Sequence, residues 1–225
     1  MKSSGWPSSR TKARWATVGA SIVNNTVTNS GYIGIRAFRN AIIAGNTVDT
    51  ACAVLTDCGG IYTEAPDNLA LNTRIENNTV TNVGRSQRLA WGIYLDNRSN
   101  AVTVSGNTVS SSGNGMLING GHDNAISGNT FSTSTQAHIQ MVEGGSGGVR
   151  NNSVTGNTFS ARNGEETYRI SSDVGVSSVA QFASYDRNGY TSSSAAFANY
   201  NGARIGYAQW KANTGQDAAS TFTVP

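Results

Sequence analysis

The 225-residue sequence is poor in charge, in proline and in long hydrophobic runs. Acidic and basic residues together make up 13% of the chain, against about 25% in ordinary soluble domains. The 16 basic residues only slightly outnumber the 13 acidic ones, so the charge does not favour a nucleic acid partner. No run of 18 apolar residues occurs, so no transmembrane helix is expected, and residues 1–20 lack the apolar segment of a signal peptide.

Cysteine is also scarce. Cys52 and Cys58 are the only two, with five residues between them. This spacing fits either a disulfide that closes a small loop or two free thiols, and the sequence leaves both open. His122 and His138 are distant in the sequence, so no zinc site is indicated.

Asparagine, by contrast, recurs in one phrase of the form aliphatic-x-[Gly/Asn]-Asn-Thr-[Val/Phe]. The phrase contains Asn25, Asn46, Asn78, Asn107, Asn129 and Asn157. Successive copies are 21 to 32 residues apart, which indicates a short unit with loops added to particular copies. A recurring period of this size is typical of a protein built from stacked repeats.

The residue types of the phrase favour strands over helices. An Ile or Val stands three residues before each Asn and a Val or Phe two residues after it, in alternation with small or polar residues. Asn tolerates the left-handed backbone region, and its amide can bond to the same amide one coil away, so it is expected to turn the chain and to form a ladder at one corner. The sequence therefore predicts an all-β fold, a right-handed parallel β-helix with about 4.8 Å between coils.

Such a solenoid needs caps, because each end exposes unpaired backbone and an apolar cross-section. We expect an N-terminal lead-in or partial cap over residues 1–20, coils over residues 21–160, and a last irregular coil with a C-terminal cap over residues 161–225. Residues 208–212 are expected to form one helical turn. The short lead-in also leads us to expect an upstream part of a longer chain.

A second strand precedes each of the later Asn phrases, as in Gly92-Ile-Tyr-Leu-Asp96. Because strand side chains alternate, one set is expected to face the core and the other the outside. The inward residues are Ile35, Ile61, Ile93, Met116 and Ile139, together with Ala37, Thr63, Leu95, Ile118 and Met141. The outward columns are Arg36, Tyr62, Tyr94, Leu117 and Gln140, and beside them Phe38, Glu64, Asp96, Asn119 and Val142.

The outward columns contain a candidate catalytic pair, Glu64 and Asp96. Their backbones would be about 4.8 Å apart, which allows the carboxyl separation of about 5 to 5.5 Å found in retaining glycosidases. Two carboxylates this close favour one neutral acid beside one ionised nucleophile. Asp57 precedes the strand of Glu64 and is the alternative in either role, while Tyr62 and Tyr94 would supply apolar surface for sugar rings.

The Asn-Thr-Val coils over residues 20–160 resemble the pectate-lyase-like superfamily of right-handed β-helix proteins. Within it, Asp57-x-Gly-Gly-Ile-Tyr62 and Gly92-Ile-Tyr-Leu-Asp96 are similar to motifs of β-helical glycoside hydrolases, which include fucosidases and xylanases acting on plant cell-wall polysaccharides. The resemblance implies that Asp57 and Asp96 are a catalytic aspartate pair. Members of that group are much longer than this chain.

Several further residues are candidates for substrate binding. The set is Arg36, Tyr62, Tyr94, Asn119, His122 and Glu143. His122 follows the strand one coil beyond Asp96, although an ordinary surface turn explains it better, and Glu143 ends the next strand. We expect a polysaccharide or oligosaccharide partner, no cofactor and no metal ligand set, with calcium between coils left open. We also expect an extracellular or periplasmic protein of bacterial origin.

Two other classes of function remain open. A polysaccharide lyase or uronan epimerase would need a basic residue, and Lys2, Lys12 and Lys211 all lie outside the coils, which leaves an arginine such as Arg36 or Arg88. A non-catalytic glycan-binding or surface solenoid would need no base or acid at all. A hydrolase with a carboxylate pair is the function that the sequence favours.

Overall fold

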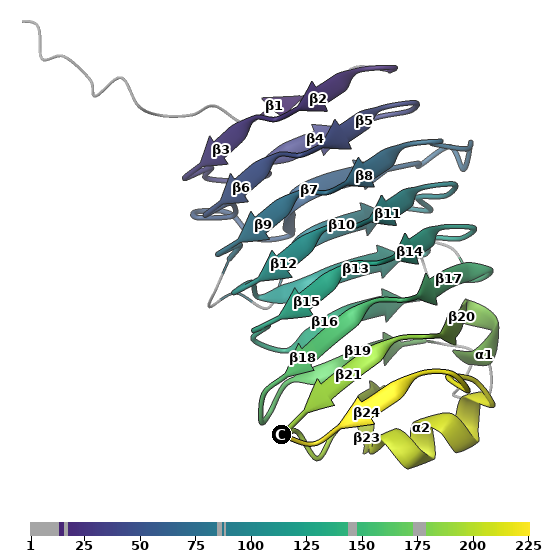
Figure 1. Cartoon of the computed structure of the whole chain (residues 1–225). Helices are drawn as coiled ribbons and strands as arrows, with labels where there is room; N and C mark the ends of the chain where they lie inside the picture. The colour runs from purple at the N-terminus through teal and green to yellow at the C-terminus, as the bar shows by residue number, and fades with distance from the viewer. Residues whose placement is uncertain (1–13, 16–17, 85–86, 88, 144–147, 173–178) are drawn as a thin grey trace, which may run out of the picture.

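The computed structural model describes residues 14–15, 18–84, 87, 89–143, 148–172 and 179–225. In Figure 1 the chain winds into a stack of coils whose short strands form three sheets. Neighbouring coils pair in parallel, apart from one antiparallel pair near the C-terminus. This arrangement confirms the predicted all-β parallel solenoid.

Each sheet takes every third strand of the chain, except that β23 pairs with β22 in sheet A. Sheet A contains β1 (Arg14–Trp15), β4 (Ile35–Ala37), β7 (Cys58–Glu64), β10 (Ala90–Asp96), β13 (Asn114–Asn119), β16 (Ala137–Val142), β19 (Glu166–Ser171), β22 (Ala198–Tyr200) and β23 (Ala203–Ile205). Sheet B contains β2 (Ser21–Val23), β5 (Ile42–Ala44), β8 (Arg74–Glu76), β11 (Thr103–Ser105), β14 (Ala125–Ser127), β17 (Asn152–Thr155) and β20 (Ala183–Asp186). Sheet C contains β3 (Thr26–Thr28), β6 (Thr47–Asp49), β9 (Thr79–Thr81), β12 (Thr108–Ser110), β15 (Thr130–Ser132), β18 (Thr158–Ala161), β21 (Gly189–Ser192) and β24 (Thr221–Thr223).

The core is built from columns of identical or similar apolar side chains. Ile35, Ile61 and Ile93 are paired in register on sheet A and are fully buried, as predicted. Gly92 also faces the core, because a Cβ atom there would lie 2.3 Å from Val109 Cγ1. Gly60 faces the core in the same way, against Val80 Cγ1 at 2.7 Å. These two glycines therefore serve core packing, because a side chain at either position would collide with a core valine.

The corner between sheets B and C, which we call the B–C corner, carries the predicted Asn ladder. In the middle of the stack, Asn78 Nδ2 donates to Asn107 Oδ1 and Asn107 Nδ2 donates to Asn129 Oδ1, both at 2.9 Å. The residue in the left-handed region, however, is the one before each ladder Asn, such as Gly106 (φ 64°). The expectation that the ladder Asn itself turns the chain is therefore corrected.

Regular coils continue beyond residue 160. The ladder gains a seventh member, Asn188, whose Oδ1 accepts from Asn157 Nδ2 at 3.2 Å. Ser220 Oγ then accepts from the Asn188 backbone N–H at 2.9 Å, in the place that an Asn Oδ1 takes elsewhere. The coil region thus extends past the boundary expected at residue 160. The repeated phrase does not reveal this coil, because Arg187 and Gly189 replace the usual neighbours of the ladder Asn.

The C-terminal end is closed by an aromatic cluster and helix α2. This helix covers Tyr207–Thr214, more than the single turn expected, and lies at the end of the stack (Figure 1). Trp210 of α2 is fully buried and stacks on Tyr168 with ring centres 4.7 Å apart. A shorter helix, α1 (Val179–Phe182), precedes β20.

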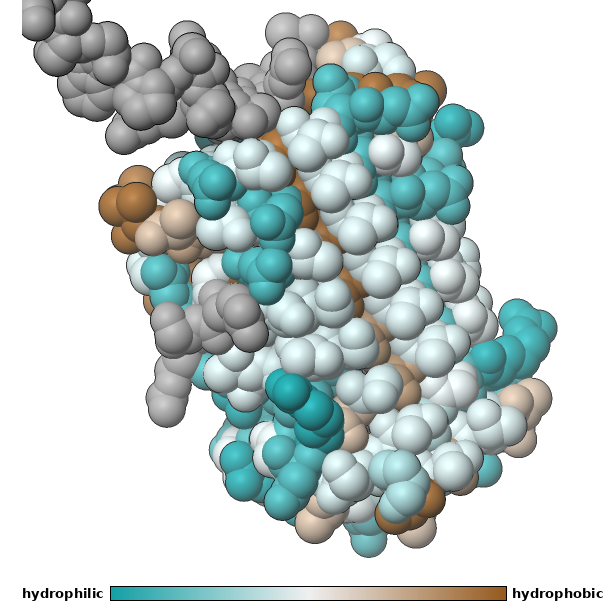
Figure 2. Space-filling model, turned by 60° about the vertical axis from the view of Figure 1, so that its left-hand side comes forward, coloured by the Kyte–Doolittle hydropathy of each residue, from teal (hydrophilic) through white to brown (hydrophobic). Residues whose placement is uncertain are grey.

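The outer face of sheet C is regular and carries little charge, with Asp49 of β6 as an acidic residue in it. One exposed Thr of each coil stands in register with the next, in the order Thr26, Thr47, Thr79, Thr108, Thr130 and Thr158. Figure 2 shows such weakly polar residues in columns along the stack, with a narrow hydrophobic stripe between them. No helix in the described part of the chain is long and apolar enough to cross a membrane.

Candidate functional site

The outer face of sheet A carries the residues that the sequence singled out. Arg36, Tyr62 and Tyr94 are in register on β4, β7 and β10, and Glu64 stands opposite Asp96. Leu117 and Gln140 continue the first column, as predicted. The parallel pairing of long strands β7 and β10 is what brings two aromatic rings and two carboxylates onto one small area.

Two tyrosine hydroxyls connect three carboxylates in this area. The Tyr62 hydroxyl donates to Asp96 Oδ2 at 2.7 Å and lies 3.1 Å from Glu64 Oε2. The Tyr94 hydroxyl donates to Asp57 Oδ1 at 3.1 Å. Arg36 forms an ion pair with Glu64. We refer to Arg36, Glu64, Tyr62, Asp96, Tyr94 and Asp57 together as the carboxylate cluster.

Asp96 lies at the centre of the cluster and is held from several sides. Besides the Tyr62 hydroxyl, it accepts bonds from the Asn97 backbone N–H (2.8 Å), Asn97 Nδ2 (3.0 Å) and Asn119 Nδ2 (2.8 Å). Its side chain is almost buried. Four donors stabilise a negative charge that would otherwise be costly at such a position. Asn119 therefore positions Asp96, and Asn97 is a site residue that the sequence reading missed although it directly follows Asp96.

Glu64 is more accessible than Asp96 and shares a donor with it. Its side chain is 19% exposed and is neutralised by Arg36. Because the Tyr62 hydroxyl contacts one oxygen of each residue, these two oxygens are no more than about 6 Å apart. This separation is below the range of about 6.5 to 9.5 Å for inverting glycosidases and allows that of retaining ones.

Asp57 approaches the cluster from the turn that leads from sheet C to sheet A. The structure joins Cys52 and Cys58 in a disulfide, so Asp57 lies in a small closed loop. Its backbone is left-handed (φ 53°), and its N–H donates to Leu89 O at 2.7 Å. Asp57 is exposed, unlike Asp96. It is thus the member of the cluster most open to solvent.

The two tyrosine rings differ from the expected open platform. Tyr62 and Tyr94 are 7% and 4% exposed and meet edge to face with centres 5.1 Å apart. Burial raises the pKa of both hydroxyls far above the usual value, and the carboxylate of Asp96 raises each pKa further. Both hydroxyls therefore stay protonated and act as hydrogen-bond donors between the carboxylates. Trp91, which the sequence reading missed, covers Tyr94 at 4.6 Å.

His122 and Glu143 lie at the turns that follow the sheet A strands. His122 bonds to Asn68 Oδ1 at 2.8 Å and to Asp123 Oδ2 at 2.6 Å. Glu143 accepts from Ser172 Oγ at 3.0 Å. None of these contacts joins the carboxylate cluster. The structure therefore brings together seven of the predicted site residues and leaves His122 and Glu143 apart.

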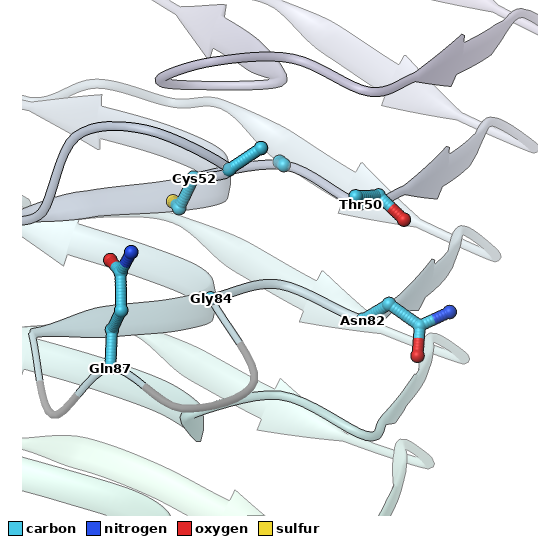
Figure 3. Close-up of a pocket in the computed structure, with 7 residues that line it drawn as sticks. Thr50, Cys52, Asn82, Gly84 and Gln87 are labelled. Carbon is cyan, nitrogen blue, oxygen red and sulfur yellow. The ribbon is translucent and has the colours of Figure 1, made fainter.

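Two surface depressions flank this face. One, of about 390 Å³, lies between neighbouring coils and is lined by residues of two turns, among them Thr50, Cys52, Asn82, Gly84 and Gln87 (Figure 3). The other, of about 180 Å³, includes Glu64. Only the smaller depression is continuous with the carboxylate cluster. Among the described residues, no group of three or more His, Cys, Asp or Glu side chains is arranged to hold a metal ion.

Comparison with known proteins bears on the fold. A family model described as the right handed beta helix region matches residues 59–202. The chain belongs to this β-helix family. The assignment agrees with the parallel pairing of successive coils in the three sheets and with the handedness predicted from the Asn phrases. No curated protein matches the sequence.

A solved structure also shares the fold. It is a mutant tailspike protein of E. coli bacteriophage HK620 in complex with a pentasaccharide. The TM-score is 0.54 at 12% sequence identity, and the match covers 91% of this chain and 40% of the tailspike chain. At this identity the likeness shows the β-helix architecture alone. The chain thus spans less than half the length of that tailspike.

Proposed function

We propose that this protein binds a polysaccharide or oligosaccharide on the outer face of sheet A and hydrolyses a glycosidic bond there. The observation that carries the proposal is the carboxylate cluster, in which two tyrosine hydroxyls join Asp57, Asp96 and Glu64. Paired carboxylates are the usual catalytic groups of glycoside hydrolases. The pentasaccharide bound to the structurally similar tailspike supports a glycan as the partner class.

The environments of the carboxylates suggest different roles. Asp96 accepts four hydrogen bonds, which suits an ionised group that attacks the anomeric carbon or stabilises its positive charge. Asp57 is the member of the cluster most open to solvent, so a bound glycan can reach it, and we assign it to protonating the leaving oxygen. Glu64 is charge-paired with Arg36, so we assign it to orienting Tyr62.

The same cluster weighs against a lyase. Such an enzyme needs a base that removes a proton from a uronate, and Arg36 is instead engaged by Glu64. Burial of Asp96 and Tyr94 favours a second candidate, a glycan-binding solenoid without turnover. In that case the cluster would serve to hold the sheet A strands and their turns in place.

The test is a screen of the full chain on xylan, pectin, alginate and a bacterial O-polysaccharide, read as new reducing ends and as absorbance of unsaturated products. We expect reducing ends without unsaturated products. Asp96→Asn should lower turnover by at least about 100-fold, and Asp57→Asn should cause a comparable loss. Glu76→Gln, which removes a partly exposed carboxylate of sheet B, should leave the rate unchanged.

Full activity of Asp96→Asn on a substrate that the parent chain cleaves would overturn the assigned mechanism. Unsaturated products would identify a lyase instead. Binding of a glycan without any cleavage would leave the non-catalytic candidate. Neither binding nor cleavage of any of these polymers would contradict both.

A further inference from the structure

The depression of about 180 Å³ lies where β4 and β7 end, beside the carboxylate cluster. Phe38 and Arg39 follow β4, while Pro66, Asp67 and Leu71 belong to the turn that follows β7. Glu64 is the residue that the depression shares with the cluster. We refer to it as the Phe38 pocket.

One side of the Phe38 pocket is apolar. Leu71 is buried, Pro66 is exposed, and Phe38 is half-buried. The guanidinium of Arg36 lies 5.3 Å from the centre of the Phe38 ring, which braces this ring next to Glu64. An aromatic ring with an accessible edge or face supplies the apolar contact that a pyranose ring needs.

The other side presents hydrogen-bond donors and acceptors. Arg39 forms an ion pair with Asp67, and its Nε donates to Ala70 O at 3.2 Å. The backbone N–H of Leu69 donates to Asp67 Oδ1 at 3.2 Å and, with Arg39, holds the pKa of Asp67 below its ordinary value. Asp67 is therefore an ionised acceptor, and 49% of its side chain stays exposed. A carboxylate beside a guanidinium can bind two neighbouring sugar hydroxyls at once.

Charge limits which sugar this pocket can take. Each acid of the pocket already faces an arginine, since Glu64 pairs with Arg36 and Asp67 with Arg39. A uronate would add a third carboxylate next to these two acids. Like charges so close repel one another, whereas neutral hydroxyls bond to both acids and arginines without that penalty.

We propose that the Phe38 pocket binds one neutral pyranose unit of the substrate, with the sugar ring on Phe38 and two hydroxyls on Asp67 and Arg39. The volume is below the range of about 300 to 1,000 Å³ for drug-sized ligands, so it fits a single ring. This inference rests on the proposed function in one respect, that the bound unit belongs to the glycan processed at Asp57 and Asp96.

The experiment measures binding of single sugars to the full chain by NMR, with labelled Phe rings as the reporter. The probes are methyl glycosides of xylose, glucose and fucose, N-acetylglucosamine, and glucuronic acid as the charged comparison. At least one neutral sugar should shift the Phe38 signal and bind in the millimolar range, and glucuronic acid should not. Phe38→Ala and Phe38→Leu should each weaken this binding by roughly tenfold, because both remove the ring and the second keeps the bulk.

Asp67→Asn should also weaken binding, by roughly five- to tenfold, because it removes a charged acceptor. Matched controls are Leu69→Ala, an exposed apolar residue of the same turn outside the pocket, and Glu76→Gln, a partly exposed carboxylate paired with Arg74. Both should bind like the parent. Failure of every neutral sugar to shift the Phe38 signal would overturn the proposal. So would equal binding of glucuronic acid, or binding unaffected by Phe38→Leu and Asp67→Asn.

The outcome can be separated from that of the hydrolase proposal. Single-sugar binding does not require Asp96, so Asp96→Asn should bind the neutral sugar as well as the parent chain does. Sugar binding without cleavage of any polymer would support the pocket proposal and contradict the hydrolase proposal. If the Phe38 and Asp67 variants cleave a polymer with unchanged KM and kcat, the hydrolase proposal is supported and the pocket proposal is contradicted.

Discussion

The B–C corner and the outer face of sheet A belong to the same coils but are built on opposite plans. At the corner, each coil repeats one residue type, and every ladder amide in the middle of the stack bonds to the coils on both sides. On sheet A the outward column changes from Arg36 to Tyr62, Tyr94, Leu117 and Gln140. Repetition serves stability, and departure from repetition supplies chemical groups.

The physical reason is the satisfaction of buried polar groups. A ladder Asn fills its hydrogen bonds with identical neighbours, so any substitution leaves several buried partners unpaired. The carboxylate cluster also satisfies its buried groups, but with partners that occur once each, such as Tyr62, Asn97 and Asn119. Four substitutions test this difference between repeated and non-repeated positions. They are given in order of their expected effect on the free energy of unfolding, the largest first.

The largest effect is expected from Asn107→Ala at the centre of the ladder. It removes donors to Ile75 O and Asn129 Oδ1 and the acceptor for the Asn78 backbone N–H. Each buried group left unpaired costs about 1–3 kcal/mol, so the free energy of unfolding should fall by about 4 kcal/mol. Urea unfolding measures it, with Asn25→Ala at the less buried end of the ladder as the milder control. Equal losses at both positions would show that the ladder does not act through burial.

The second effect concerns a core position at which the repeat changes. His138 of β16 stands in register with the core-facing Gly115 of β13, one coil away. The Nε2 atom of His138 lies 3.7 Å from Glu165 Oε2, and Glu165 also pairs with Arg162. Burial lowers the pKa of His138 from 6.5 to about 4. Between these two pH values the unfolded chain binds the proton and the folded chain does not, so stability falls as the pH falls through this window.

The expected loss for His138 is about 3 kcal/mol between pH 6.5 and pH 4, and it should level off below pH 4. The measurement is urea unfolding at several pH values for the parent and for His138→Gln. Carboxylates titrate in the same range, so the difference between the two proteins is the quantity that isolates His138. Identical pH profiles would contradict a buried neutral imidazole.

A smaller effect is expected from Tyr62→Phe in the carboxylate cluster. The change removes the donor shared by Asp96 Oδ2 and Glu64 Oε2 and keeps the ring. We expect a loss of about 1–2 kcal/mol in the free energy of unfolding and an altered pH profile of any glycan cleavage. The reason is that Asp96 and Glu64 then lose the tyrosine hydroxyl that both contact. Tyr32→Phe is the control, since its exposed hydroxyl donates to a backbone carbonyl, Asp57 O, at 3.0 Å and not to a carboxylate of the cluster. An unchanged pH profile would argue against Tyr62 as the link between the acids.

The smallest effect is expected on the regular outer face of sheet C. Thr108 is exposed in the Thr column, so Thr108→Val should change the free energy of unfolding by less than about 0.5 kcal/mol. Its neighbour Val109 is 1% exposed, and Val109→Ala should cost about 2–3 kcal/mol through lost packing. A large loss of unfolding free energy for Thr108→Val would mean that the Thr column stabilises the fold by more than the β-propensity of its residues.

Much of the candidate site could be read from the sequence because alternation in strands is a local rule. The similar sequences Gly60-Ile-Tyr-Thr-Glu64 and Gly92-Ile-Tyr-Leu-Asp96 predict that Tyr62 lies beside Tyr94 and Glu64 beside Asp96. The pairing of β7 with β10 has this register. Asn97 was missed because a residue after a strand carries no periodic signal. Trp91 was missed for a different reason, since its Nε1 bonds to Gln140 two coils away and only the stacked coils bring the two together.

The sequence by itself determined the solenoid, because six copies of one phrase impose the same corner on six coils and leave no alternative register. It did not show that the ladder continues to Asn188, where the flanking residues change but the corner geometry persists. Only the tertiary structure decided that the rings of Tyr62 and Tyr94 are buried and that their hydroxyls bridge three acids. Burial and shared protons depend on side chains from several coils at once, and no local pattern in one strand encodes them.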